Sequence, residues 1–111
     1  MFKVRQATEK DAVAIRDVAT KAWHNTYLNI YAASTVNELL AASYNETHLK
    51  KRLNEQLFLV AEEDSEIVGF ANFIYGEELY LSAHYVRPES QHKGYGTRLL
   101  EAGLKRFKDQ Y

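Results

Sequence analysis

Two glycines separated by one residue, Gly94 and Gly96, stand just before an apolar helical pattern. The N–H groups at a helix start have no partner inside the helix and carry a positive partial charge. Glycine lets an anion come close to the backbone and permits positive φ. With the hydroxyl of Thr97 in the first turn, the stretch QHKGYGT over 91–97 predicts a cradle for a phosphate or pyrophosphate group.

Two better-known phosphate motifs fit this stretch poorly. A P-loop requires Gly-Lys-Ser/Thr at its end, where this chain has Gly96-Thr97-Arg98. A dinucleotide fingerprint requires a third glycine where Leu99 stands, and it opens a fold rather than closing one. The remaining alternative is that both glycines only make a tight turn from strand to helix.

A histidine in the preceding strand pattern is the candidate for proton transfer. His84 comes one residue before Tyr85, and strict alternation places Tyr80, Ser82, His84 and Val86 on one face. His84 is therefore a candidate general base facing a cleft, with a hydrogen-bonded structural histidine as the alternative. The chain has no cysteine, and no set of His, Asp and Glu has the spacing of a metal site.

Aromatic residues form the third candidate group. Trp23, Tyr27 and Tyr31 follow one another in and after the first helical pattern, and Phe73 lies in a later strand pattern. Aromatic faces attract cations, so these side chains are candidates for an amine-binding pocket. Their alternative role is to fill the core between helix and sheet.

The elements that must hold these residues follow from apolar spacing. A strand is expected over 4–7. The helix that follows has Thr8 as its candidate cap and Asp11 as an acidic residue at its start, and it ends near residue 25. Ser34 or Thr35 is expected to cap a short helix over 36–42, and Asn45 a second helix over 47–54. Strands over 57–61, 66–75 and 79–86 form an antiparallel meander.

The final helix starts near Gly94 and directs five residues inward: Leu99, Leu100, Gly103, Leu104 and Phe107. The element order is β-α-α(-α)-β-β-β-α, where the parentheses mark the second of the two short helices, in an α/β class fold with a mixed sheet.

Composition limits the classes of function. The chain has 111 residues and a net charge of -1, which suits one small domain and lacks the basic footprint of a nucleic-acid binder. It has no membrane-length apolar run and no signal peptide pattern. The absence of cysteine fits a cytoplasmic protein.

The chain resembles the GNAT superfamily of N-acetyltransferases. That family carries Gln/Arg-x-x-Gly-x-Gly/Ala after its fourth strand, and the six residues from Gln91 to Gly96 match each specified position. The stretches HYVRPESQHKGYGTRLL, LFLVAEEDSEIVGFANF and VRQATEKDAVAIRDVATKAW are similar to other parts of the family pattern, so the resemblance covers nearly the whole chain.

The resemblance implies acetyl-CoA as acyl donor and a primary amine of a small molecule or peptide as acceptor, joined by direct attack in a ternary complex. It also implies that main-chain groups of Tyr85 and Val86 contact the pantetheine arm. The implied pyrophosphate contacts, with Gln91 shaping the loop, are Gln91, His92, Lys93, Gly94, Tyr95, Gly96 and Thr97.

The resemblance further implies elements beyond residue 111. Relatives continue with a parallel strand, and with a helix that supplies a tyrosine proposed as general acid, for which this sequence has no match. We therefore expect 1–111 to be a single N-acetyltransferase domain that is incomplete at its C-terminus, with an open sheet edge that a homo-oligomer could cover. The alternative function is a non-catalytic fragment that binds acyl-CoA or mediates dimerisation.

Overall fold

The structure, a computed structural model, describes residues 2–111. Its elements in chain order are β1 (Phe2–Gln6), a 3-10 turn (Glu9–Asp11), α1 (Ala12–Tyr27), α2 (Ala33–Tyr44), α3 (Glu46–Glu55), β2 (Leu57–Glu63), β3 (Glu66–Ile74), β4 (Tyr80–Val86), a second 3-10 turn (Pro88–Ser90) and α4 (Tyr95–Phe107). This order confirms the predicted fold class and sequence of elements.

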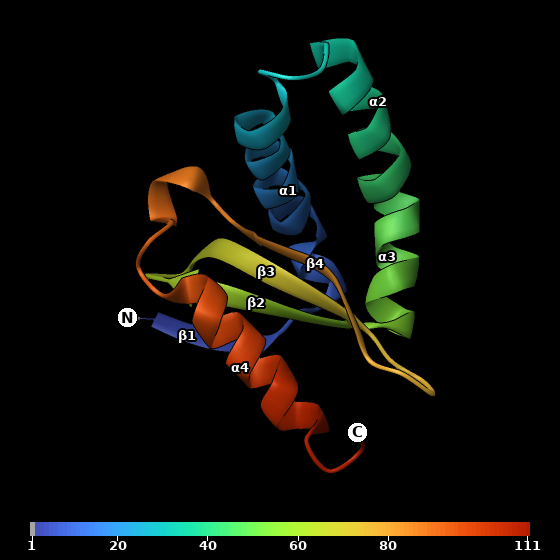
Figure 1. The fold of residues 1–111 in the computed structure, drawn as a ribbon, viewed down its shortest axis with the longest axis vertical. Coiled ribbons are helices and arrows are strands. Elements are labelled where there is room, and N and C mark those ends of the chain that lie inside the picture. The colour runs from blue at the N-terminus through green and yellow to red at the C-terminus, as the bar shows by residue number, and fades with distance from the viewer. Residues whose placement is uncertain (1) are drawn as a thin grey trace.

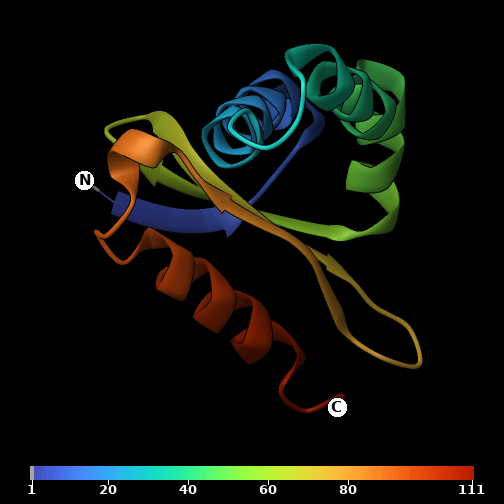
Figure 2. The same cartoon turned by 45° about the horizontal axis from the view of Figure 1, so that its top comes forward.

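The four strands form one sheet in the order β1-β2-β3-β4 (Figure 1). Every pairing among the described residues is antiparallel, so the predicted three-stranded meander gains β1 as a fourth member. The helices α1, α2 and α3 cover one face of the sheet and α4 covers the other (Figure 2). Within residues 2–111, β4 pairs with β3 alone and its second edge is open.

Each sheet face has its own apolar core. On the α1 face, Ile15 and Val18 pack with Phe58 and Phe70, and all four are at most 1% exposed. On the α4 face, Leu99 and Phe107 pack with residues of β2 and β3. Strand β2 contributes to both cores because the apolar run over 57–61 is buried on both faces, as predicted.

The helix starts agree only partly with prediction. Asn45 caps α3 as expected, since its side chain accepts a hydrogen bond from the His48 N–H at 2.8 Å. The expected caps Ser34 and Thr35 are wrong, because α2 begins earlier and takes Ala32 as its N-cap. Leu104, expected to face inward, is 51% exposed.

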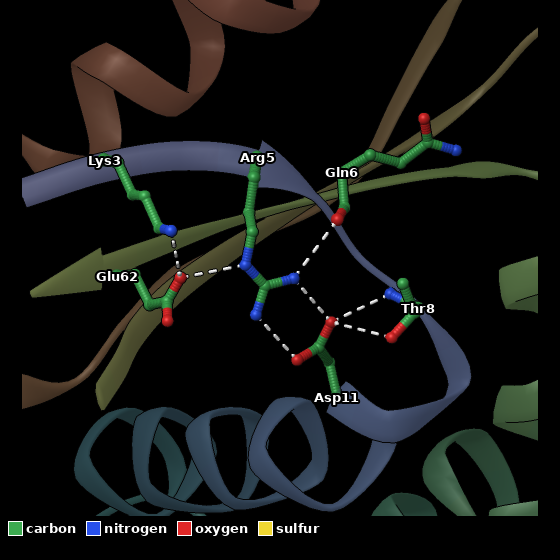
Figure 3. A network of polar contacts seen from close by, with 6 residues as sticks. All are labelled: Lys3, Arg5, Gln6, Thr8, Asp11 and Glu62. Carbon is green, nitrogen blue, oxygen red and sulfur yellow. Dashed lines mark hydrogen bonds and ion pairs between the residues drawn. The ribbon is translucent and has the colours of Figure 1, made fainter. Parts of the chain in front are cut away.

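The start of α1 is held by a network of charged side chains (Figure 3). Arg5 of β1 donates to both carboxylate oxygens of Asp11, at 2.8 and 2.9 Å, and to Glu62 of β2 at 2.8 Å. Asp11 also accepts from the Thr8 N–H at 2.8 Å. The guanidinium of Arg5 is the main reason that the pKa of Asp11 lies below its usual value. The network ties the first helix to the sheet.

A bulge in β4 corrects the predicted alternation. Asn72 pairs with Ala83 while the next residue of β3 pairs with Leu81, so Ser82 is the extra residue. Ser82 consequently lines the same hollow as Ala83 and Tyr85, whereas strict alternation had placed it with His84. The predicted common face of Tyr80, Ser82, His84 and Val86 is therefore wrong.

No helix within residues 2–111 is long and apolar enough to cross a membrane.

Candidate functional site

The segment between β4 and α4 forms an open, strained loop. Pro88 ends β4 and begins a short 3-10 turn, after which the chain reaches Gly94. Gly94 has φ +87°, a left-handed conformation that glycine adopts without steric cost. His92 also has positive φ, at +66°, which is uncommon for a residue with a side chain. The loop therefore adopts the special backbone geometry that the two-glycine pattern predicts.

The start of α4 lacks a protein cap. Gly94 occupies the N-cap position, no side chain of the described residues accepts from the first N–H groups of the helix, and the first turn contains no acidic residue. The first backbone bond of the helix is donated by the Arg98 N–H to the Gly94 carbonyl, at 3.1 Å. The amides of Tyr95, Gly96 and Thr97 precede that bond, as orphan donors at a helix start do. Together they form a positive site that an anion can occupy.

A hollow of about 370 Å³ opens beside these amides. It is lined by residues of β4 and the loop: His84, Val86, Ser90, Gln91, His92, Gly94, Tyr95, Gly96 and Thr97. A Cβ on Gly96 would lie 3.4 Å from the Nε2 atom of His84, so a larger side chain there would enter the hollow. Eight of the nine predicted cofactor residues, all but Tyr85, and the predicted base line this hollow or the adjoining one beside Lys93.

One ring nitrogen of His84 is engaged in a hydrogen bond to α4. Its Nε2 lies 2.7 Å from the carbonyl oxygen of Gly96. A carbonyl can only accept, so Nε2 carries the hydrogen and Nδ1 is the atom left to accept a proton. His84 therefore holds the first turn of α4 as well as facing the hollow.

Gln91 ties the loop back to the strand. Its side-chain N–H₂ donates to the Val86 carbonyl at 3.3 Å. The Arg87 N–H donates in the opposite direction, to Val68 of β3 at 2.8 Å. Because N–H directions alternate along a strand, the Val86 N–H points to the open edge and the Tyr85 N–H to β3. Of these two predicted residues, Val86 has the main-chain donor on the open side.

Tyr95 directs its side chain away from the hollow. Its hydroxyl donates to the Glu63 carboxylate, which raises the pKa of Tyr95 to about 12. Its ring packs against Phe2 with centroids 4.7 Å apart. Tyr95 thus offers only its backbone to a bound anion. The neighbouring Lys93 is exposed beside the loop.

The predicted aromatic residues of α1 gather on the other sheet face. The ring centroids of Trp23 and Tyr27 lie 5.7 Å apart, and those of Tyr27 and Tyr31 lie 6.2 Å apart. With Val36 and Leu39 of α2, among others, they line an apolar hollow of about 360 Å³.

Phe73 does not join this aromatic group. It is 1% exposed and belongs to the core on the α4 face. A Cβ on Gly103 of α4 would lie 2.1 Å from the Phe73 ring, so α4 packs directly on this ring. The expectation that Phe73 lies beside the acceptor aromatics is therefore corrected, because its β3 position faces α4 rather than α1.

A further hollow, of about 500 Å³, lies between α3 and the β3–β4 edge. Its lining includes Trp23 and the β4 residues Ser82, Ala83 and Tyr85. The side of α3 contributes polar and charged residues to it, namely His48, Lys51, Arg52, Glu55 and the following Gln56. Local sequence patterns give no reason to connect these α3 residues with a site, because helical spacing alone assigns them to a solvated face.

Arg87 is a second residue that sequence reasoning missed. It is 6% exposed, and its Nε donates to the Ile67 carbonyl at 2.9 Å while Nη1 pairs with Asp17 of α1. It thereby anchors the base of the loop to β3 and α1. Because Asp17 lies 70 residues away along the chain, no local pattern could reveal the pair.

Known proteins share both the pattern and the fold. The model of the acetyltransferase (GNAT) family matches residues 15–110. The PaiA N-acetyltransferase from Thermoplasma acidophilum, solved in complex with coenzyme A, is similar with a TM-score of 0.93 and 26% identity. That match covers 99% of this chain and 74% of the other. No curated protein matches the sequence.

Two further solved structures extend the comparison. A GNAT family acetyltransferase from Brucella melitensis, in complex with acetyl-CoA, has a TM-score of 0.73 and 25% identity, over 98% of this chain and 70% of the other. A GCN5-related N-acetyltransferase from Rhodopseudomonas palustris has a TM-score of 0.82 at 23% identity, over 97% of this chain and 66% of the other. At 23% identity, the similarity to the Rhodopseudomonas palustris protein shows a shared fold alone.

The family match spans most of the chain, from within α1 to beyond α4. It includes the loop and nearly all the residues that line the hollows described above. Resemblance to these acetyltransferases supports acyltransferase activity. The chain belongs to the GNAT family of acetyltransferases.

Proposed function

We propose that the protein transfers an acetyl group from acetyl-CoA to a primary amine of a small molecule or peptide, by direct attack within a ternary complex. The observation that carries this proposal is the uncapped start of α4 beside the open edge of β4. A helix start without a cap or an acidic residue is suited to an anion, and the pyrophosphate of coenzyme A supplies one. Two similar acetyltransferases are solved with coenzyme A or acetyl-CoA.

In this proposal the loop holds the pyrophosphate and β4 holds the pantetheine arm. The backbone amides from His92 to Thr97 donate to the phosphate oxygens, and Gln91 fixes the loop through the Val86 carbonyl. The outward N–H of Val86 is the donor aimed at the thioester oxygen. A fixed donor at that place stabilises the negative charge that develops there during attack.

The acetyl transfer needs no covalent enzyme intermediate. The amine nitrogen attacks the thioester carbon, the C–S bond then breaks, and the acetyl group is left on nitrogen. An ammonium acceptor loses two protons in all, one before the attack and one from the attacking nitrogen. The departing thiolate takes up one proton, so one proton is released to solvent overall. We assign the first proton to Nδ1 of His84, because Nε2 donates to Gly96.

The acceptor amine is assigned to the face that carries α1, whereas the His84 ring lies on the α4 side of β4. In this proposal the proton therefore reaches Nδ1 through water around the open edge of β4, and not by direct contact. Trp23, Tyr27 and Tyr31 form an aromatic wall on the α1 face, and Tyr85 of β4 reaches the adjoining hollow. The aromatic faces of Trp23 and Tyr85, which line the hollow shared with β4, favour a cationic amine before it loses its proton. A cytoplasmic location and a homo-oligomer that covers the β4 edge remain predictions, and the mass of the protein in solution tests the latter.

The first test is calorimetric titration of the 111-residue chain with acetyl-CoA, followed by an assay of coenzyme A release with a panel of amines. Micromolar binding and amine-dependent release are expected. Binding without release for any amine would instead identify a non-catalytic acyl-CoA-binding module. If a folded chain does not bind acetyl-CoA, the cradle assignment is wrong.

A separate test addresses the base. His84→Ala is expected to lower the rate constant of acetyl transfer by about 100-fold, the usual contribution of a general base. Its affinity for acetyl-CoA should change much less, because the amides of the cradle remain. A matched control is His24→Ala, since His24 bonds to Asn37 of α2 at 2.8 Å, away from the loop. Equal rates for the two variants would remove His84 as the base.

A further inference from the structure

Arg52 of α3 is held by neutral groups on every side that the structure describes. Its Nη1 donates to the Ser43 carbonyl and its Nη2 to the Asn72 side-chain oxygen, both at 2.8 Å. Its guanidinium carbon lies 5.2 Å from the ring centroid of Tyr44 and 5.4 Å from that of Phe58. The group is thus partly buried and fixed in place by neutral partners, and a guanidinium has five N–H donors in all, more than these two hydrogen bonds use.

Within residues 2–111, the charge of Arg52 has no counterion. No carboxylate of the described residues lies within ion-pair distance of Arg52 or of the adjacent Lys51. The other fixed arginines differ, because Arg5 pairs with Asp11 and Arg87 pairs with Asp17. A partly buried cation without a counterion is costly unless something compensates for it. Arg52 therefore has the character of a site for an anion.

Both cations line the hollow of about 500 Å³ that also reaches β4. Glu55 is the single carboxylate among the described residues that line this hollow. Trp23, which separates this hollow from the aromatic one, has a buried indole N–H without a hydrogen-bond partner in residues 2–111. Two cations thus line a hollow whose other wall is the strand of the proposed thioester site.

We propose that this hollow selects an acceptor amine that also carries a carboxylate, with Arg52 and Lys51 as its anion subsite. The inference rests on the proposed acetyltransferase function and specifies its acceptor. The planar fork of Arg52 matches a carboxylate, and Lys51 adds a mobile second charge. The amine of the same molecule then lies toward Ser82 and Tyr85 of β4.

The neighbouring aromatic hollow indicates the rest of the acceptor. It contains no charged residue among those that line it, and Trp23, Tyr27 and Leu39 contribute apolar surface. An α-amino acid with an apolar side chain fits both hollows. Its carboxylate lies beside Arg52 and Lys51, its amine beside β4, and its side chain in the aromatic hollow. A polyamine has only cationic ends, and Arg52 and Lys51 would repel them.

Matched acceptors test this selection directly. The rate of coenzyme A release is measured with L-leucine, L-leucinamide and spermidine, each with saturating acetyl-CoA. We expect kcat/KM for L-leucine to exceed that for L-leucinamide by at least about tenfold, since a hydrogen bond to a charged group contributes that much. Equal values for the two, or a preference for spermidine, would overturn the carboxylate subsite.

Neighbouring lysines provide a controlled pair of variants. Lys51→Ala should raise KM for L-leucine about threefold and leave KM for L-leucinamide unchanged, as the loss of one exposed charge predicts. Lys50→Ala removes the same charge one residue away, but Lys50 pairs with Glu46 at 2.9 Å and does not line the hollow. If the two variants behave alike toward L-leucine, Lys51 has no part in the subsite.

A binding measurement keeps this inference separate from the acetyl-transfer proposal. Trp23 is the single tryptophan of the sequence, so its fluorescence reports on the wall of the hollow. Titration with L-leucine should change that fluorescence at concentrations at least about tenfold lower than titration with L-leucinamide. No change, or equal responses, would overturn the subsite even if acetyl-CoA binds. A preferential response without acetyl-CoA binding would retain the subsite and reject the acetyltransferase proposal.

Discussion

The starts of α3 and α4 face the same physical problem and resolve it differently. Each helix exposes N–H groups that have no partner within the helix. At α3, Asn45 accepts from the His48 N–H, and Glu46 places a negative charge in the first turn. At α4, Gly94 provides no side chain, and no acidic residue lies in the first turn.

The difference separates a helix start that serves the fold from one that serves a ligand. A side-chain cap contributes about 1 kcal/mol to stability. Leaving α4 uncapped gives up that contribution and keeps its donors available to an anion. Leu99, the fifth residue of α4, is fully buried. Packing of this side chain, and not a cap, therefore holds the start of α4 in place.

The largest expected effect comes from closing the open helix start. Gly96→Val places its Cβ 3.4 Å from the His84 ring, so that the added methyl groups enter the hollow beside the first-turn amides. We expect affinity for acetyl-CoA to fall by at least about 100-fold, as the loss of two charge-assisted hydrogen bonds predicts, while the free energy of unfolding changes little. Calorimetry measures the affinity and urea unfolding measures the stability.

The control for this variant is the same substitution at another glycine. Gly76 lies in the exposed turn between β3 and β4, with nothing within 4 Å of its Cβ position. Gly76→Val should therefore leave acetyl-CoA affinity unchanged. Equal affinity for the two variants would show that the start of α4 is not the phosphate site.

Local patterns predicted both helix starts, because a cap and a glycine pair act over a few residues. Asn45 was predicted from its own type and the apolar spacing after it, and the structure confirms it. The same reasoning failed for Ser34 and Thr35, since α2 begins before them without any side-chain cap. A capping residue indicates where a helix can start, whereas packing decides where it does.

Features that depend on distant residues were beyond a reading of local patterns. The bulge at Ser82 depends on how β4 pairs with β3, and it changed which residues share a hollow with Tyr85. Phe73 was assigned to the acceptor site by type, but its position in the register turns it toward Gly103 of α4. The proposed anion subsite at Arg52 became visible only when its neutral partners were known.

The residues before α1 extend the comparison to a helix start held by an ion pair, in which Asp11 makes no side-chain cap bond to the helix. Asp11 is 7% exposed and accepts from Thr8 and from both ends of the Arg5 guanidinium. Asp11→Asn should lower the free energy of unfolding by about 2 kcal/mol at neutral pH, because charge-assisted bonds are lost. Acetyl-CoA affinity should not change. Asp109→Asn, at an exposed site near the C-terminus, is the matched control.

The pH dependence of that difference has a definite sign. The folded-state pKa of Asp11 lies below its ordinary value of 3.8, chiefly because of Arg5. Its stabilisation is therefore fully present above that ordinary value and is lost as pH falls through the folded-state pKa. Urea unfolding at several pH values should show the wild type and Asp11→Asn converging in acid. A constant difference down to low pH would contradict the assignment to the ionised carboxylate.

The smallest effect is expected at the capped start of α3. Asn45→Ala should lower the free energy of unfolding by about 1 kcal/mol, because the His48 N–H loses its partner. Asn54→Ala is the matched control, since Asn54 is exposed and its amide donates only to the Lys50 carbonyl of its own helix. Acetyl-CoA affinity should be the same in both variants, whereas Gly96→Val shows the opposite pattern of lost affinity and kept stability. If Asn45→Ala weakened acetyl-CoA binding as much as it weakened the fold, the two helix starts would be coupled, and the division between a structural start and a ligand-binding start would fail.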